Sequence, residues 1–475
     1  MHRLLRIALV VLGLVVLSAP ASALASHFRG ASITWTRASA SSQVVNFNVT
    51  HSWRCCPGMN FRYGGGSPSS QNLASNLIGS FTDSSGASYQ TYNSTATHTY
   101  PGSGPYTAYF QSNARIGGMG FASNQSFRVE SVVNFSGGNT ASPAIGTSAL
   151  LQLVRGAQNS VSMAIVDPDN GASATCGWAT CSQAGVSSSQ CNATGGEFRP
   201  SWLSLDTTNC VLSGTPPTGG AILWPYAVRV TDNNGAVTTF DGMIELVTGT
   251  PPTCTGGGNF NASVGQPFST SFTGSNPAGG TITMQLASGP PGGTLSPLSG
   301  SSPLTSTFNW TPSASDFGQT YAATVIVSNS TNLQTTCPLG LTVPQNQPPV
   351  VSTTGPYQGV NGVPTPVNGS ATDPDGTVAT YEWDCDGDGV FEIGPQATAA
   401  ATCGPITSSG TYTITLRVTD TAGGIGSTTT TITIPSLPPV ANAGGPYTGN
   451  IAIPVALSGN GSSDPDGTIA TYEWD

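Results

Sequence analysis

The sequence predicts an all-β protein made of tandem β-sandwich domains in an extended array. Short runs of alternating apolar and polar residues recur along the chain, and clusters of Gly, Ser and Pro separate them, as expected for strands joined by turns. The C-terminal third is repeated: ATDPDGTVATYEWD at 371–384 matches SSDPDGTIATYEWD at 462–475 in eleven of fourteen positions. The copies begin 91 residues apart, which is the size of one small sandwich domain.

The first 25 residues have the form of a signal peptide. Arg3 and Arg6 precede an apolar run at 7–17, and Ala23-Leu24-Ala25 has the small residues of a signal-peptidase site. We expect cleavage after Ala25, which makes the mature chain a secreted or cell-surface protein. No later stretch approaches the roughly 20 apolar residues of a membrane helix, so no membrane span is expected in these residues.

The composition limits the classes of partner. All twelve basic residues are Arg, and removing Arg3 and Arg6 with the signal peptide changes the formal net charge from −10 to −12. A nucleic-acid interface requires clustered cations, so no nucleic-acid partner is expected. The partner is therefore expected to be an unidentified extracellular protein or polysaccharide.

Residues 26–148 are expected to form a β-rich N-terminal module. The runs ASITWTR, QVVNFNVTHSW and FRVESVVNF alternate apolar and polar residues. The opening SHFRGASITW, with HTYPGSGPYTAYF and FRVESVVNF, resembles a module without assigned activity at the start of secreted bacterial proteins. His27 and Arg29 are interpreted as the polar edge of the first strand, with a recognition element as the alternative.

Residues 149–249 are expected to form a second module. The segment PSWLSLDTTNCVLSGTPP resembles the Ig-like or cadherin-like repeats of bacterial surface proteins, which implies that Trp202, Leu203 and Leu205 belong to the core. Between Cys176 and Cys191 lies an insertion with little strand pattern. It is either a binding loop or a loop that disulfides merely hold in place.

Residues 253–344 are expected to form a third module. The segment FNWTPSASDFGQTYAATVIVSN resembles the same class of repeat, which implies a core containing Trp310 and Tyr321. Pro-Pro pairs at the module junctions, beginning at Pro251, Pro348 and Pro438, favour extended and semi-rigid connections. A rod of separate sandwiches is therefore expected.

Residues 346–435, and the truncated copy at 437–475, resemble PKD domains. The order GPY, DPDGT, YEWD, a Gly-Asp-Gly turn and GTYTITLRVTDTAGG carries this resemblance. It implies an immunoglobulin-like β-sandwich with a surface role and no catalytic residues. The alternation in 412–419 predicts that Leu416 is buried and Arg417 exposed, with Trp383 and Tyr381 against the same core.

Ten Cys in an exported chain predict disulfides. Each of two modules has a single pair, so we predict bridges from Cys254 to Cys337 and from Cys385 to Cys403. Two bridges of open connectivity are predicted in the second module, among Cys176, Cys181, Cys191 and Cys210. Zinc is disfavoured because these four form no CxxC pair. Three pairings stay open for the adjacent Cys55 and Cys56: a vicinal disulfide, a bond to another chain, or a bond to a later domain.

The sequence contains no HExxH, no GxSxG and no phosphate-binding Gly-rich loop. We therefore expect no enzyme within these residues. The expected function is extracellular adhesion or ligand binding through the tandem modules. The alternative is an accessory region, for spacing or substrate binding, of a secreted hydrolase whose catalytic domain lies beyond residue 475.

Two acidic clusters are candidate calcium sites, and the sequence favours the first of them. Asp384, Asp386, Asp388 and Gly389 resemble the first half of an EF-hand loop, although Pro395 stands at the twelfth position and Glu392 at the ninth. Glu392, backbone carbonyls, water, or Asp373 and Asp375 would then complete the cage. A parallel set occupies positions that resemble the calcium ligands of cadherin-like repeats: Asp167, Asp169 and Asp232. The alternative is that these residues only form turns.

Overall fold

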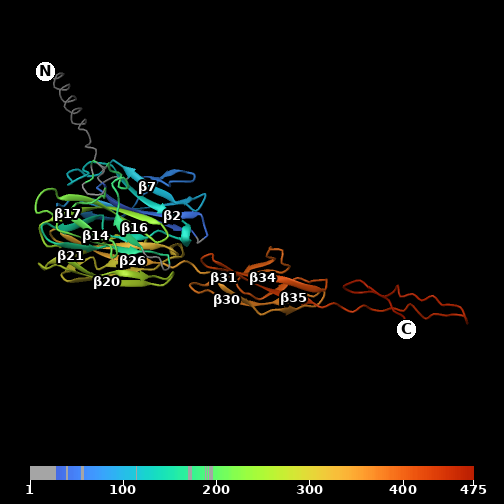
Figure 1. The fold of residues 1–475 in the computed structure, drawn as a ribbon. Coiled ribbons are helices and arrows are strands. Elements are labelled where there is room, and N and C mark those ends of the chain that lie inside the picture. Colours follow the sequence, from blue (N-terminus) through green and yellow to red (C-terminus); the bar gives the residue numbers. More distant parts are fainter. Residues whose placement is uncertain are drawn as a thin grey trace, which may run out of the picture. The chain divides into compact units, whose positions relative to one another are not determined.

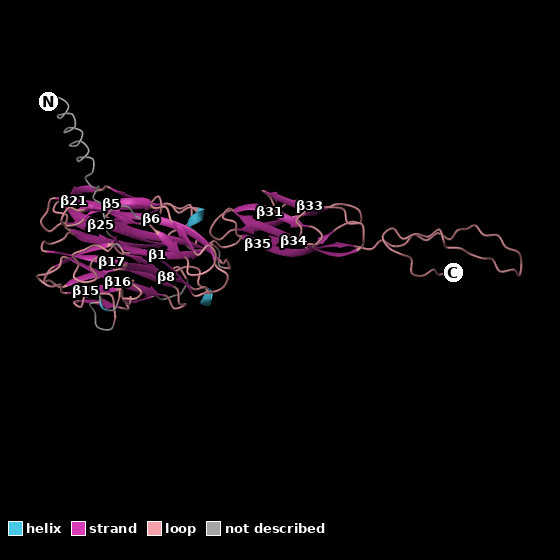
Figure 2. Cartoon of the chain, turned by 90° about the horizontal axis from the view of Figure 1, so that it is seen from above, coloured by secondary structure: helices cyan, strands magenta, loops and turns pink. Residues whose placement is uncertain are grey.

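The computed structural model describes residues 28–38, 41–54, 58–113, 115–169, 174–187, 189, 191 and 196–475. The predicted signal peptide, His27, Cys55 and Cys56 lie outside the described residues. The chain divides into two compact units, residues 1–345 and 346–475. The described elements are strands apart from two three-residue 3-10 helices, η1 (Ser136–Gly138) and η3 (Ala314–Asp316), which confirms the all-β class (Figure 2).

The first unit is organised around strand β17 (Val237–Val247), whose eleven residues are all buried. One edge of β17 pairs from Val237 to Glu245 with β16 (Leu223–Thr231). The other edge pairs in turn with β8 (Phe127–Val133), β1 (Phe28–Arg37) and, in parallel, β10 (Leu150–Val154). A single strand therefore joins the sheet of residues 26–148 to that of residues 149–249.

The sheet that contains β17 has twelve strands and curls around a core rich in aromatic side chains. Its remaining members are β2 (Val44–Trp53), β3 (Asn60–Arg62), β4 (Ser70–Asn72), β5 (Asn76–Thr82), β6 (Ser88–Thr99), β7 (Tyr106–Ser112) and β13 (Thr175–Trp178). Two small sheets complete the second module: β11 (Asn159–Ser162), β15 (Val211–Gly214) and β14 (Leu203–Asp206), and β12 (Ala164–Val166) with β9 (Ala144–Gly146), which precedes the expected start of the module. Leu203 is buried there, and Trp202 and Leu205 pack against the same core.

The third module is a sandwich of two sheets. The first consists of β18 (Thr253–Gly256), β20 (Phe268–Ser275), β24 (Leu304–Trp310) and β22 (Thr294–Ser296). The second consists of β19 (Gly258–Asn261), β26 (Gln334–Thr342), β25 (Thr320–Asn329), β21 (Thr281–Ser288) and β23 (Ser299–Ser301). Trp310 and Tyr321 lie in the core between them, as expected.

Within residues 28–345 the structure differs from the expected rod, because the three modules pack into one compact unit. A shared apolar cluster contains side chains of all three: Phe81, Tyr89, Leu150, Met243, Ala287 and Ile326. The physical reason is that β17 is buried along its whole length, and an isolated second module would leave one of its faces exposed to water. Alternation within a strand does not reveal which module covers it.

The second unit contains the first PKD-like repeat (Figure 1). Its main sheet consists of β28 (Tyr357–Gln358), β35 (Ile425–Ile434), β34 (Gly410–Asp420), β31 (Val378–Asp384) and β32 (Ile393–Gln396). Two strand pairs face it: β27 (Val350–Thr353) with β30 (Gly369–Thr372), and β29 (Thr365–Val367) with β33 (Ala401–Cys403). Leu416 and Trp383 are fully buried, Tyr381 packs against them, and Arg417 forms a surface ion pair with Glu382. The predicted register is confirmed.

The second repeat reproduces local contacts of the first without its core. The Tyr447 hydroxyl accepts a hydrogen bond from Ser458 N, as the Tyr357 hydroxyl does from Asn368 N. Trp474, the counterpart of Trp383, is 46% exposed because residues 437–475 contain no counterpart of β34.

The structure contains four disulfides. Cys254 pairs with Cys337 and Cys385 with Cys403, with Cα–Cα distances of 5.9 Å and 5.6 Å. In the second module the bridges join Cys176 to Cys210 and Cys181 to Cys191. The first of these closes the core of the module, and the second holds the insertion.

Candidate metal centres and the junction of the modules

The strongest candidate metal centre is the carboxylate cluster of the second module. Asp167 and Asp169 follow β12, and Asp232 follows β16. One oxygen of each carboxylate lies within 4.8 Å of the others. The turn after β16 therefore lies beside the turn after β12.

Each carboxylate of this cluster uses one oxygen to fix the backbone. Oδ1 of Asp167 accepts a hydrogen bond from Asp169 N at 3.1 Å, and Oδ1 of Asp232 accepts from Ala236 N at 2.8 Å. Oδ1 of Asp169 accepts from the backbone N–H of Thr140 at 3.0 Å and from its hydroxyl. In Asp167 and Asp232 the turn-forming role is thus filled by Oδ1 alone.

The second oxygens of the cluster have no partner. Oδ2 of Asp167, Asp169 and Asp232 is buried in each case and forms no hydrogen bond, and Asp232 is only 5% exposed. No ion pair among the described residues includes any of the three. Because burying an unpaired carboxylate is costly, the arrangement fits a bound cation. Ligands that are all oxygen suit Ca²⁺ or Mg²⁺.

The electrostatics of the cluster agree with this assignment. The pKa of Asp167 is raised to about 6, chiefly by burial and also by the charges of Asp232 and Asp169, against a hydrogen bond from Asp169 N that lowers it. Burial also raises the pKa of Asp232. A divalent cation would remove this repulsion.

The loop after β31 is the second candidate. One ligand atom each of Asp384, Asp386, Asp388 and Glu392 lies within 4.8 Å of the others. Both oxygens of the buried Asp384 already accept backbone N–H groups, from Gly387 at 2.7 Å and from Gly389 at 3.0 Å. The other three side chains are exposed, and Glu392 accepts from Cys385 N at 2.7 Å.

Asp373 and Asp375 lie outside this second group. The Asp375 carboxylate instead accepts a hydrogen bond from Gln347 N at 3.1 Å. The turn-forming interpretation therefore describes much of the loop. The structure reverses the order of the two candidate calcium sites. The sequence favoured the loop after β31, whereas the buried Oδ2 atoms without a hydrogen bond favour the cluster of the second module.

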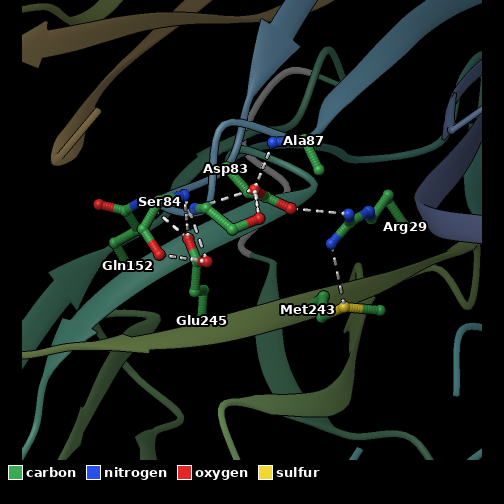
Figure 3. A network of polar contacts seen from close by, with 8 residues as sticks. Arg29, Asp83, Ser84, Ala87, Gln152, Met243 and Glu245 are labelled. Carbon is green, nitrogen blue, oxygen red and sulfur yellow. Dashed lines mark hydrogen bonds and ion pairs between the residues drawn. The ribbon is translucent and has the colours of Figure 1, made fainter. Parts of the chain in front are cut away.

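A polar network that the sequence did not predict joins the modules around β17. The buried guanidinium of Arg29 forms an ion pair with Asp83 at 3.0 Å and contacts the sulfur of Met243 (Figure 3). Both interpretations of Arg29, as a polar strand edge or as a recognition element, are therefore wrong. Arg29 stands between Phe28 and Gly30, and no pattern in the sequence there indicates a buried ion pair.

Glu245 occupies the middle of the same network. It accepts hydrogen bonds from the Ser84 hydroxyl at 2.6 Å and from Gln152 Nε2 at 2.8 Å (Figure 3). Gln152 in turn accepts from Gln334 N at 2.8 Å, which belongs to the third module. Residues of all three modules thus share one chain of hydrogen bonds.

A buried His–Ser contact in the first module does not have the geometry of a catalytic pair. His51 Nε2 lies 3.0 Å from the Ser94 hydroxyl, and both residues are fully buried. Trp53 Nε1 donates to His51 Nδ1 at 2.8 Å. Since an indole N–H can only donate, Nδ1 holds the lone pair and Nε2 carries the proton, so Nε2 cannot take a proton from Ser94.

His51 gives a pH-dependent stability. Burial lowers its pKa to about 3, whereas an unfolded His titrates near 6.5. Below pH 6.5 the unfolded chain therefore binds a proton that the folded chain excludes, and stability is lost as the pH falls. Between pH 7.5 and pH 5 the loss should be about 2 kcal/mol, and His51→Gln should remove it. Urea unfolding of both proteins at the two pH values tests this; equal losses would contradict it.

Family models match three segments of the chain. The model described as Integrin beta-like protein A-E, N-terminal, matches residues 29–136, Putative Ig domain matches 143–249, and a model of a PKD domain matches 361–434. The mouse Dyslexia-associated protein KIAA0319 homolog is 36% identical over 139 residues, which is 27% of this chain and 12% of that protein. The chain thus spans about an eighth of this curated relative. The expected bacterial origin finds no support in these matches.

Among solved structures, the PKD1 domain of Vibrio anguillarum Epp is 29% identical, with a TM-score of 0.16; the match covers 19% of this chain and all of that one. The eight N-terminal Ig domains of Down Syndrome Cell Adhesion Molecule are 13% identical, with a TM-score of 0.21, covering 83% and 47% of the two chains. The family models and the disulfides indicate an extracellular or cell-surface protein with adhesion-type domains. None of the helices that the structure describes could cross a membrane.

Proposed function

We propose that this chain is a secreted or cell-surface, non-catalytic adhesion protein that binds Ca²⁺ and presents its partner-binding surface on tandem β-sandwich modules. The observation that carries the proposal is the group of three buried and unpartnered Oδ2 atoms on Asp167, Asp169 and Asp232. The adhesion-type domain matches and the geometry of His51 and Ser94 support a binding role rather than catalysis.

The cation would bind between turns of the second module. The three Oδ2 atoms supply carboxylate ligands, and water would complete the six to eight oxygens that Ca²⁺ takes. Asp169 also binds Thr140, which lies in the segment between β8 and β9. Ca²⁺ would therefore stabilise the connection between the first and second modules. The loop with Asp384, Asp386, Asp388 and Glu392 is a second, weaker calcium site.

Calcium should raise the thermal stability of the first unit. At a concentration one hundred times the Kd, Ca²⁺ adds about 2.7 kcal/mol of stability, which for a unit of this size raises Tm by about 4 °C. Thermal unfolding of the full chain, followed by circular dichroism in Ca²⁺ and in EDTA, measures the shift.

A matched pair of variants locates the effect. Asp232→Asn should abolish the shift, because it removes the charge of the most buried ligand. Asp206→Asn changes an exposed turn Asp outside the cluster and should leave the shift intact. The calcium proposal fails if Ca²⁺ and EDTA give the same melting curve, or if both variants respond alike.

A further inference from the structure

The third module presents a surface without charge. Within residues 253–344, Asp316 is the only acidic or basic residue. It is buried and accepts hydrogen bonds from Ser313 N and from the Tyr321 hydroxyl. Whatever binds this module therefore meets neutral groups only.

The outer face of the β20–β24 sheet is a regular array of hydroxyl groups. The register places Ser269 opposite Asn309, Ser271 opposite Thr307, and Thr273 opposite Thr305. Their neighbours in sequence, such as Phe272 and Phe308, point inward and are buried. We call the outward positions of β18, β20, β22 and β24 the hydroxyl face.

The two edge strands continue the hydroxyl face with the same residue types. Thr255 of β18 lies opposite Thr273, and Ser296 of β22 lies opposite Thr307. Neighbouring strands are about 4.8 Å apart, and outward residues repeat about every 6.8 Å along a strand. Cross-strand contacts hold the side chains in place, with 2.9 Å between the hydroxyls of Thr273 and Thr305. Strand β20 lies at the margin of its unit (Figure 1).

The chemistry of the hydroxyl face narrows the class of partner. A stable protein interface is anchored by aromatic side chains or Arg, and none of the outward positions carries either. An anionic polymer or an acidic membrane surface would require Arg or Lys, which are also absent. Hydroxyl and amide groups that both donate and accept hydrogen bonds match a neutral polymer that is itself rich in hydroxyls.

We propose that the hydroxyl face binds a neutral polysaccharide, a polymer of sugar units without carboxylate, sulfate or phosphate groups. The proposal rests on the proposed binding function and names the chemical class of its partner. A single hydrogen bond to a sugar contributes little net binding free energy, because it replaces a hydrogen bond to water. Several sugar units must therefore lie across the strands at once. Binding should therefore require a long polymer and be insensitive to salt.

Sedimentation with insoluble polysaccharides tests this on the full mature chain. The probes are microcrystalline cellulose, an insoluble β-1,3-glucan and chitin, with cross-linked polygalacturonate as an anionic comparison. We expect retention on at least one neutral probe, unchanged between 50 mM and 1 M NaCl. The double variant Ser269→Glu/Ser271→Glu places charges on the face and should reduce the retained fraction at least tenfold.

The matched control is Thr97→Glu/Ser204→Glu, with two exposed positions of the other modules. Its retention should stay within twofold of the unmodified chain. Retention on no neutral probe, loss of retention in 1 M NaCl, or equal retention of the two double variants would overturn the proposal. So would a dimer that only the face variant disrupts, which would assign the face to a second copy. The calcium-dependent Tm, measured on the same preparations, tests the proposed function separately.

Discussion

Asp241→Ala should destabilise residues 28–345 by about 3–5 kcal/mol, because it leaves the guanidinium of Arg115 buried without its counter-charge. Arg115 Nη1 donates to Asp241 Oδ1 at 3.0 Å, and a second guanidinium nitrogen donates to Oδ2. Both side chains are almost completely buried. Asp241 lies in β17 and Arg115 in the first module, so the loss should weaken the contact between modules.

Urea unfolding of the full chain measures this cost in the transition of the first unit. The control is Glu197→Ala, which removes the partner of Arg199 from a more exposed ion pair. That change should cost at most about 1 kcal/mol. Equal costs for the two variants would mean that the buried pair does not hold the modules together.

Trp383→Ala should destabilise the first PKD-like repeat by about 3–5 kcal/mol. The indole is fully buried, and its Nε1 donates to Ala399 O at 2.8 Å. The loss of this side chain leaves a cavity against Leu416 and removes a buried hydrogen bond. Such a cost is a large part of the roughly 5–15 kcal/mol that typically stabilises a protein.

The chain supplies its own control for this prediction. Trp474 has the same local sequence, Tyr-Glu-Trp-Asp, but is 46% exposed. Trp474→Ala should therefore change the free energy of unfolding of the second unit by less than about 1 kcal/mol. If the two substitutions had equal effects in urea unfolding, burial of Trp383 would not be the source of its contribution.

Local features of the fold could be predicted from the sequence because they depend on short-range rules. Alternation in 412–419 is enough to place Leu416 inside and Arg417 outside. A module with two Cys allows one bridge, so the pairs Cys254–Cys337 and Cys385–Cys403 needed no structure. The acidic turns were also visible, since Asp-Pro-Asp and Asp-Asn-Asn segments are turn signals.

The packing between modules could not be predicted for a physical reason. Hydrogen bonds along the edges of β17 involve backbone groups, so no side-chain pattern identifies β1, β8 and β10 as its partners. Asp241 and Glu245 stand within an apolar strand, and a sequence does not show whether such charges face water or a partner. For the same reason the sequence could not reveal that Oδ2 of Asp232 lacks a partner while both oxygens of Asp384 have theirs.

Residues 28–345 should unfold as one body, because β17 hydrogen-bonds strands of two modules and the cluster around Met243 includes all three. Scanning calorimetry of the full chain tests this most directly. We predict one transition for this unit with a calorimetric enthalpy of about 220 kcal/mol near 60 °C, equal to its van't Hoff enthalpy. Asp241→Ala should shift this transition, and Trp383→Ala should shift only that of the PKD-like repeat. Three smaller transitions within residues 28–345, of which Asp241→Ala shifts only one, would contradict the account of the three modules as one cooperative unit.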